Sequence, residues 1–315
     1  MNWKDYRPRM QGKDMLTLQD YTPDELNCII NLAIELKEER QSGIPHNYLE
    51  KKTLAMIFQK ASTRTRVSFE VGAFQLGGNA LFLSAQELQM GRGEPVKDTA
   101  RTLSRYVDGI MIRTFEQAEV EELAHYATVP VINGLTDRFH PCQVLADLLT
   151  IKEQKGNLQG LKLAYLGDGN NVAHSLLLGC SRAGMHIAVS TPPEYTPEKE
   201  IIELARETAG ETGAKVEVTE DPHQAAQDAD VLYTDVWASM GQEDEQEQRR
   251  SKLRQYQLNR QLLDKAAPEA IVMHCLPAYR GEEISEEVME SSASVIFDQA
   301  ENRLHAQKAL MALIM

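Results

Sequence analysis

Short apolar runs alternate with helix-spaced apolar positions along most of the chain. The runs that predict strands stand at residues 53–58, 109–112, 129–132, 161–166, 186–189, 231–233 and 270–273. Between them, apolar residues recur at the three- and four-residue spacing of helices. Strands that alternate with helices are typical of parallel sheets whose faces are covered by helices. The pattern therefore predicts an α/β fold.

The length of 315 residues is large for one hydrophobic core, so we expect two domains. A helix whose apolar positions include Leu145 and Leu148 ends near Gly156, and the domain boundary is expected there. We expect two Rossmann-like domains, at residues 1–150 and 151–298, each a parallel sheet flanked by helices. A C-terminal helix at residues 299–315 is expected to pack back on the first domain.

The composition is typical of a soluble globular protein, with 42% hydrophobic and 25% charged residues and no apolar run as long as a bilayer span. Lys and Arg number 33 against 47 Asp and Glu, and the net charge of −14 disfavours binding to nucleic acid or to an anionic membrane. An anionic ligand therefore needs a local cluster of arginines.

The cysteines and the N-terminus indicate a cytoplasmic setting. Cys28, Cys142, Cys180 and Cys275 are scattered without CxxC spacing, in a chain too large to need disulfide bonds for stability. Residues 1–15 lack the apolar segment of a secretory signal. We expect reduced thiols and a cytoplasmic location.

Hydroxyl and guanidinium groups gather where the first predicted strand meets a helix. The segment is Ser62, Thr63, Arg64, Thr65 and Arg66. Helix N-termini carry partial positive charge and free N–H groups, so arginines there are electrostatically unfavourable unless an anion is present. Hydroxyls, N–H groups and forked guanidinium groups are the donors that bind phosphate. The segment predicts a phosphate site, although alone it is equally compatible with a capped helix whose arginines point into water.

A second polar cluster opens the helix that ends the first domain. His140 and Gln143 flank Pro141, which suits the first turn of a helix, and their spacing lets them face one side as two donors. Such donors suit a carbonyl oxygen that gains negative charge during acyl transfer. Alone, the cluster is also compatible with a histidine in a structural hydrogen bond.

A glycine turn opens the second domain. Residues 167–169 form a Gly-Asp-Gly turn, but Val172 occupies the third glycine position of a dinucleotide-binding motif. The next strand ends at Ser190 and Thr191 without the acidic residue that would hold a ribose. Asn170 and Asn171 instead offer amides to a different ligand. Further on, the Glu-, Gln- and Arg-rich run at 242–250 is compatible with a mobile loop or a solvated helix start.

Two further polar segments follow predicted strands of the second domain. Asp235 is a natural partner for an ammonium group, although helix caps and turns also use Asp. His274 and Cys275 follow the last strand, where open α/β sheets bind ligands. Combining them with His140 and Cys142 into a zinc site is disfavoured by the spacing.

Seven segments, in order along nearly the whole chain, resemble the aspartate/ornithine carbamoyltransferase family. They are residues 62–66 (STRTR), 89–93 (QMGRG), 140–143 (HPCQ), 168–171 (DGNN), 235–241 (DVWASMG), 274–277 (HCLP) and 300–303 (AENR). Several motifs in family order are far more specific than any one of them.

The resemblance implies that the first domain binds carbamoyl phosphate. The residues concerned are Ser62, Thr63, Arg64, Thr65, Gln89, Arg113, His140, Pro141, Cys142, Gln143, Cys275, Leu276 and Arg303. In this family the segment containing Gln89 reaches a neighbouring subunit, which implies a homotrimer or an assembly of trimers. The Leu276–Pro277 bond is implied to be cis, which costs little before proline.

The resemblance also implies that the second domain binds L-ornithine through Asn171, Asp235, Ser239 and Met240. Asp235 would meet the α-ammonium group. Residues 231–241 resemble an ornithine-type loop and contain none of the arginines expected for a second carboxylate. The implied reaction moves the carbamoyl group of carbamoyl phosphate to the side-chain amine of ornithine and gives citrulline and phosphate, within arginine metabolism.

The charges predict the catalytic roles in that reaction. A dry, closed cleft between the domains favours the neutral amine, which attacks directly. Arg64, Arg113 and His140 would stabilise the oxyanion and the departing phosphate, and Cys275 would orient the amine without a covalent bond. No cofactor or metal is required.

Three alternatives stay open at the level of the sequence. The first is a sister carbamoyltransferase that uses putrescine, acetylornithine or aspartate. The second is a non-catalytic nucleotide-binding module, suggested by the Gly-Asp-Gly turn. The third is a zinc-dependent hydrolase. The catalytic residues would serve citrulline synthesis and citrulline breakdown alike.

Overall fold

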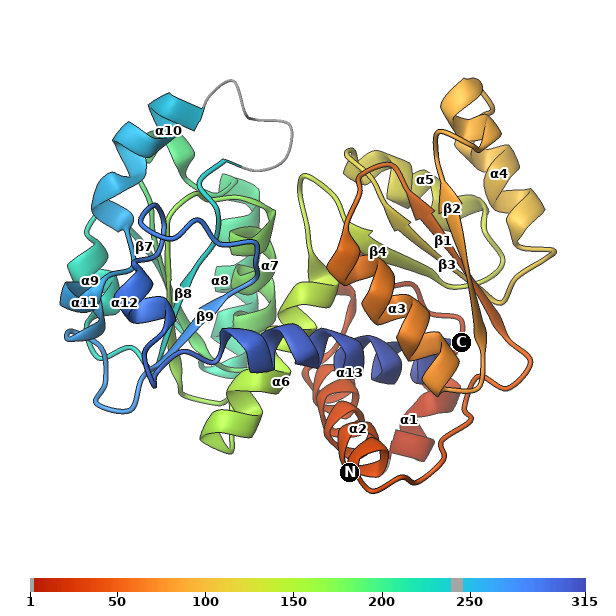
Figure 1. Ribbon diagram of the computed structural model, residues 1–315, viewed down its shortest axis with the longest axis horizontal. Helices are drawn as coiled ribbons and strands as arrows, with labels where there is room; N and C mark the ends of the chain where they lie inside the picture. Colours follow the sequence, from red (N-terminus) through yellow and green to blue (C-terminus); the bar gives the residue numbers. More distant parts are fainter. Residues whose placement is uncertain (1–2, 239–245) are drawn as a thin grey trace. The chain divides into compact units, whose positions relative to one another are not determined.

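The computed structural model describes residues 3–238 and 246–315. Contacts between Cα atoms divide the chain into two compact units: Met1–Leu149 together with Glu301–Met315, and Thr150–Ala300. Each unit contains one fully parallel sheet flanked by helices (Figure 1). The predicted α/β class with two parallel sheets is confirmed.

The sheet of the first unit has four strands in the order β2-β1-β3-β4. Its strands are β1 (Thr53–Phe58), β2 (Asn79–Ser84), β3 (Gly109–Arg113) and β4 (Val131–Leu135). Its helices are α1 (Trp3–Met10), η1 (Leu18–Asp20), α2 (Pro23–Gln41), α3 (Thr63–Gln75), η2 (Gln89–Arg92), α4 (Val96–Leu103), α5 (Gln117–Tyr126) and most of α6 (Pro141–Lys155). The central strand β3 is buried along its whole length, which explains its uninterrupted apolar run.

The C-terminal helix α13 (Ile296–Ile314) packs on the first unit, as predicted. Lys37 on α2 donates to Asn302 at 2.8 Å, and Lys308 donates to Gln75 on α3 at 3.1 Å. Figure 1 shows α13 beside α2 and α3. The side chain of Met311 lies 3.1 Å from the position of a Cβ added to Gly72, so a larger residue there would push the two helices apart.

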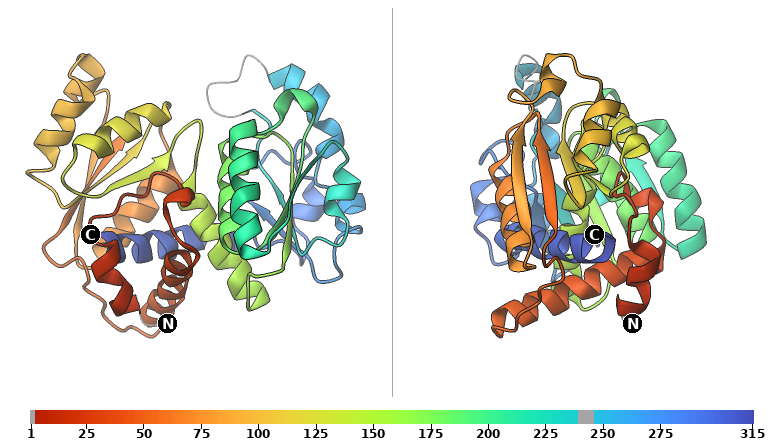
Figure 2. Two further views of the ribbon diagram at one scale, coloured as in Figure 1. Left: turned by 180° about the vertical axis from the view of Figure 1, so that it is seen from behind. Right: turned by 90° about the vertical axis from the view of Figure 1, so that its right-hand side faces the viewer.

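The sheet of the second unit has five strands in the order β7-β6-β5-β8-β9. They are β5 (Lys162–Leu166), β6 (His186–Ser190), β7 (Val216–Thr219), β8 (Val231–Thr234) and β9 (Ile271–His274). Its helices are α7 (Asn171–Arg182), η3 (Pro193–Tyr195), α8 (Lys199–Thr212), α9 (Pro222–Ala226), α10 (Gln246–Leu253), η5 (Arg254–Tyr256), α11 (Arg260–Leu263) and α12 (Glu286–Met289). Figure 2 shows α7 and α8 together on one face of this sheet.

The apolar pattern located the central strands but not two edge strands. β2 and β7 lie at the edges of their sheets, and each keeps its residues half-buried or exposed. An edge strand buries less side-chain surface and carries a weaker pattern than a central strand. No helix within residues 3–238 and 246–315 is long and apolar enough to cross a membrane.

Candidate active site

The start of α3 is tied to α13 through a shared hydroxyl. Ser62 caps the helix and accepts the N–H of Thr65 at 3.2 Å. The Ser62 hydroxyl also donates to the Thr65 hydroxyl at 3.0 Å, and Arg303 of α13 donates to the same oxygen at 2.9 Å. Thr63 is exposed and Arg64 is half-buried in the same turn. The helix start predicted from the sequence is confirmed, and Arg303 joins it.

Three guanidinium groups influence one another in the first unit. Arg113 ends β3 and is only 7% exposed. Burial, and then the charges of Arg303 and Arg64, lower the pKa of Arg113 to about 10. The buried Nε of Arg113 donates to no atom of the described residues. Buried like charges are costly without a counter-charge, so this cluster is suited to an anion.

His140 lies in the electrostatic field of this cluster as a neutral imidazole. It is buried immediately before α6, which begins at Pro141. Burial, followed by the charges of Arg303 and Arg113, holds the pKa of His140 well below its ordinary value. A neutral imidazole next to cationic groups can hydrogen-bond a carbonyl group without adding a further charge.

Gln143 and Cys142 are both buried on α6 and are suited to different tasks. The Gln143 amide nitrogen donates to Asp147 at 2.8 Å, so the amide oxygen faces the other way, and it accepts no hydrogen bond from the described residues. Gln143 thus offers an acceptor as well as the predicted donor. Cys142 donates to the Asn133 carbonyl at 3.5 Å, and burial raises the pKa of its thiol to about 12. Cys142 therefore packs as a protonated thiol rather than a nucleophile.

Gln89 is not joined to this cluster within one chain. It is exposed on η2, a short turn of helix after β2. Among the described residues no hydrogen bond links its side chain to Ser62 or Arg64. The same absence of a link is expected if Gln89 serves the site of another subunit.

The second unit gathers three side chains at the ends of β5, β8 and β9. Asn170 caps α7, where its side-chain oxygen accepts from two backbone N–H groups. Its amide nitrogen donates to Asp235 at 2.7 Å, and the Cys275 thiol donates to the other oxygen of Asp235 at 2.9 Å. Because these strands are neighbours in a parallel sheet, their carboxyl ends meet at one edge. The edge offers a fixed carboxylate.

The remaining predicted residues of the second unit are placed only in part. Asn171 is the first residue of α7 and is half-exposed beside the Asn170 cap. Ser239 and Met240 lie outside the described residues. Leu276 adopts a positive φ of 58°, and the Leu276–Pro277 bond is cis, as the resemblance implies.

Arg249 is a buried residue that the sequence pattern did not single out. It belongs to the charged run at 242–250, yet it is only 7% exposed on α10. It donates to Asp168 at 2.8 Å and to the Trp237 carbonyl at 3.3 Å, and it stacks on the ring of Tyr195 at 4.6 Å. One guanidinium group thus connects the loops after three strands. Of the two alternatives left open for this run, the helix is present from Gln246 onward, and residues 242–245 lie outside the described residues. Arg249 is buried, so the solvated alternative is wrong for this residue.

Asp235, His274 and Cys275 hold potential metal ligands within 4.8 Å of one another. Both ring nitrogens of His274 are already hydrogen-bonded: Nδ1 accepts the N–H of Leu276 at 2.9 Å, and Nε2 lies 3.1 Å from Glu283. A metal would have to replace one of these bonds. The donor set fits a hydrogen-bond network better than a zinc site.

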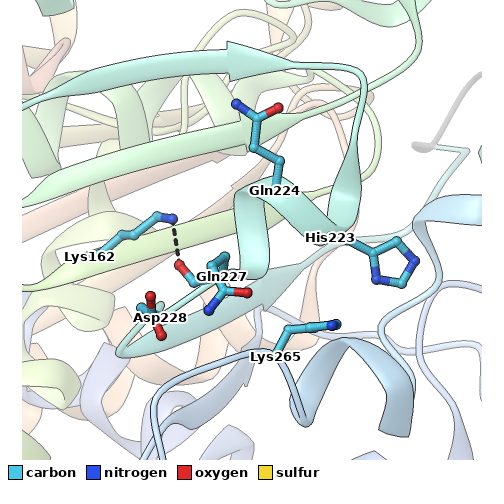
Figure 3. Close-up of a pocket in the computed structure, with 6 residues that line it drawn as sticks. All are labelled: Lys162, His223, Gln224, Gln227, Asp228 and Lys265. Carbon is cyan, nitrogen blue, oxygen red and sulfur yellow. Dashed lines mark hydrogen bonds between the residues drawn. The ribbon is translucent and has the colours of Figure 1, made fainter.

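A pocket of about 600 Å³ opens at the opposite edge of the second sheet (Figure 3). It is lined by Lys162, His223, Gln224, Gln227, Asp228 and Lys265. Lys162 begins β5, and its ammonium group donates to the Gln227 carbonyl at 2.8 Å. This pocket therefore lies away from the Asp235 edge.

Comparison with known families identifies the class of protein that this fold and these clusters define. The carbamoyl-phosphate-binding domain of the aspartate/ornithine carbamoyltransferases matches residues 13–153, and their aspartate/ornithine-binding domain matches residues 159–314. The chain belongs to the aspartate/ornithine carbamoyltransferase family and is a carbamoyltransferase.

Relatives of high sequence identity carry the name ornithine carbamoyltransferase. The ornithine carbamoyltransferase of Oceanobacillus iheyensis is 58% identical over 306 residues, 97% of this chain and 95% of that protein. The anabolic ornithine carbamoyltransferase of Pyrococcus furiosus is 56% identical over 97% of both chains. The solved structure of the ornithine carbamoyltransferase from Pyrococcus furiosus has a TM-score of 0.95 over 97% of this chain and 98% of that one. For Gloeobacter violaceus the TM-score is 0.87 at 54% identity, over 97% and 99%.

Proposed function

We propose that the chain transfers the carbamoyl group of carbamoyl phosphate to the side-chain amine of L-ornithine and releases L-citrulline and phosphate. The observation that carries this proposal is the buried group of Arg113, Arg303 and neutral His140 next to the α3 start. It combines an anion site with a hydrogen-bonding group for a carbonyl. The relatives named ornithine carbamoyltransferase support ornithine as the amine, and the anabolic relative supports a place in arginine biosynthesis.

Carbamoyl phosphate occupies the first half of this proposed site. The α3 start with Ser62, Thr63, Arg64 and Thr65 holds the phosphate together with Arg113 and Arg303. His140 donates to the carbamoyl oxygen, and the Gln143 oxygen accepts from the carbamoyl amine. Pro141 and Cys142 fix the backbone of that turn, and the backbone of Cys275 and Leu276 completes the site.

Ornithine occupies the second half. The Asp235 carboxylate binds the α-ammonium group, and its existing donors, Asn170 and Cys275, fix the direction of both oxygens. Asn171, Ser239 and Met240 are proposed as further contacts by their family positions. A carboxylate held by two donors presents its oxygens to a cation in a fixed direction.

The reaction needs no group other than side chains and the two substrates. The neutral δ-amine attacks the carbamoyl carbon, and the bond from that carbon to the phosphate oxygen breaks. The proton that the attacking nitrogen loses passes to the departing phosphate, which leaves as hydrogen phosphate. Arg64, Arg113 and His140 stabilise the charge that moves from the carbonyl oxygen to the phosphate. Binding both substrates on one enzyme supplies the proximity.

We propose residues 1–150 as the carbamoyl-phosphate domain, 151–298 as the ornithine domain and 299–315 as the returning helix, in a cytoplasmic enzyme. The division of contacts after Leu149 and after Ala300 supports these bounds.

A trimer is proposed from one exposed apolar surface of the first unit. It consists of Val67 and Phe74 on α3 and Phe82 on the edge strand β2, where Arg66 of α3 lies over the Phe82 ring, and Phe74 is 77% exposed. Large apolar side chains gathered in this way mark association surfaces. Phe74→Asp should yield smaller species in sedimentation velocity, whereas the control Tyr106→Asp, at an equally exposed aromatic outside this surface, should not.

The function is tested by phosphate release from carbamoyl phosphate with ornithine, putrescine, acetylornithine or aspartate supplied separately. We expect release with ornithine alone and citrulline as its product. Preference for another amine would overturn the assignment of Asp235 and its loop while leaving the first half in place. No release with any amine would overturn the transferase assignment for this chain.

A further inference from the structure

The turn after β9 is held in a conformation that its own sequence disfavours. Leu276 has a φ of 58°, in the left-handed region that non-glycine residues avoid. Such a conformation persists only where its surroundings fix it, and it is concentrated at functional sites. The contacts that fix it therefore decide where the Cys275 thiol and the Leu276 backbone lie.

A buried series of hydrogen bonds supplies those contacts. The N–H of Leu276 donates to His274 Nδ1 at 2.9 Å, and His274 Nε2 lies 3.1 Å from Glu283. The side chains of His274 and Glu283 are both fully buried. The same Glu283 oxygen accepts the N–H of Tyr279 at 2.5 Å, so Glu283 closes the far side of the turn.

A second series of buried hydrogen bonds fixes the backbone on the other side of His274. The His274 N–H donates to Gln299 at 2.9 Å, and the Gln299 amide nitrogen donates to the Tyr233 hydroxyl at 3.0 Å. Gln299 and Tyr233 are also fully buried. The residue before Cys275 therefore cannot move to relieve the strain at Leu276.

These contacts require one tautomer of His274. Nδ1 can accept from Leu276 only if the ring proton is on Nε2, where the Glu283 carboxylate accepts it. With the proton on Nδ1, two donors would face each other in a buried space. We propose that His274 and Glu283 are positioning residues for the carbamoyl transfer. The Glu283 carboxylate keeps the ring proton of His274 on Nε2. The free Nδ1 then holds the Cys275–Leu276 backbone in the position that the carbamoyl-phosphate site requires. This inference rests on the proposed function, which uses that backbone.

Two substitutions of His274 separate the two bonds. Asn presents an oxygen near the position of Nδ1 and keeps the acceptor for Leu276, whereas Gln reaches toward Glu283 but leaves no acceptor at Nδ1. We expect His274→Gln to lower kcat about 100-fold, as a misplaced reacting group does, and His274→Asn to keep kcat within about tenfold of the wild type. Both variants are checked for folding by circular dichroism and thermal melting.

The matched control is a second buried histidine beside a glutamate, His46, which lies 3.1 Å from Glu39 in the first unit. His46→Asn should lower the melting temperature without lowering kcat. Folded His274→Gln with the kcat of the wild type, or equal losses in both His274 variants, would overturn the positioning role. If the wild type itself gives no ornithine-dependent phosphate release, the proposed function fails instead.

The tautomer is also measurable without turnover. In protein labelled with ¹⁵N-histidine, the His274 signals are identified by their loss in His274→Asn. We expect a protonated Nε2 and an unprotonated Nδ1, and Glu283→Leu should abolish this preference. A protonated Nδ1 in the wild type would contradict the proposal.

Discussion

Lys308 is a fully buried lysine whose charge the fold tolerates poorly. It lies on α13, and its ammonium group donates to Gln75 at 3.1 Å. Burial, and then the nearby charge of Arg40, lower the pKa of Lys308 to about 8, while Glu39 acts in the opposite direction. We therefore predict that Lys308→Met stabilises the protein at neutral pH.

The size of the effect follows from the shift in pKa. A drop from 10.5 to about 8 corresponds to about 3 kcal/mol lost by the folded state at pH 7. The variant also loses the hydrogen bond from Lys308 to the half-buried Gln75. This loss destabilises the folded state by about 1 kcal/mol, because water can replace the ammonium group as donor, so the net stabilisation is about 2 kcal/mol. Because the folded pKa is the lower one, the unfolded chain binds more protons between pH 8 and 10.5, and wild-type stability rises with pH across that window.

Thermal melting at two pH values tests this reasoning. At pH 7 the variant should melt about 5 °C higher than the wild type. At pH 10 the charge penalty falls to about 1 kcal/mol, so the two melting temperatures should nearly coincide. The control Lys199→Met, at a lysine whose side chain is 89% exposed, should change neither. A variant that melts lower than the wild type at pH 7, or a gap that does not shrink with pH, would refute the argument.

Three further predictions concern the site. Arg249→Met removes the 2.8 Å ion pair with the buried Asp168 carboxylate and should cost about 3 kcal/mol of stability and raise KM for ornithine. Arg250→Met, at the exposed neighbour, should do neither in the same assays. His140→Asn should lower kcat about 100-fold between pH 6 and 9. The acid limb of the pH profile of kcat should not move, because the imidazole is already neutral in this range. A shifted acid limb with an unchanged kcat on the plateau would contradict this. Cys275→Ser keeps a hydroxyl donor and should retain at least about a tenth of kcat, and a complete loss with intact substrate binding would indicate a covalent role.

The parts of the fold that the sequence predicts are those with local causes. Thr22 and Glu25 form a reciprocal cap at the start of α2, with bonds of 3.2 and 2.9 Å between residues only three positions apart. The central strands appear as apolar runs because both of their faces are buried. The α3 start is equally local, since an N-cap serine and the next turn define it.

Other features depend on residues far apart in the sequence, and the sequence does not reveal them. The Arg249–Asp168 pair joins residues 81 positions apart, and Arg303 meets Thr65 across 238. A charged run such as 242–250 has the same composition whether its arginine points into water or into the protein. Only the packing of α10 over Trp237 and Tyr195 buries that guanidinium group.

The sequence by itself therefore determines the α/β class, the helix starts and the residue types of the carbamoyltransferase motifs, because caps, periodicity and motifs act over a few neighbouring residues. The tertiary structure decides which charged groups lie close enough to shift a neighbour's pKa, as Arg303 does for Arg113, and which tautomer His274 adopts. Those properties depend on distance and burial, and both arise only when parallel strands bring their carboxyl ends to one edge.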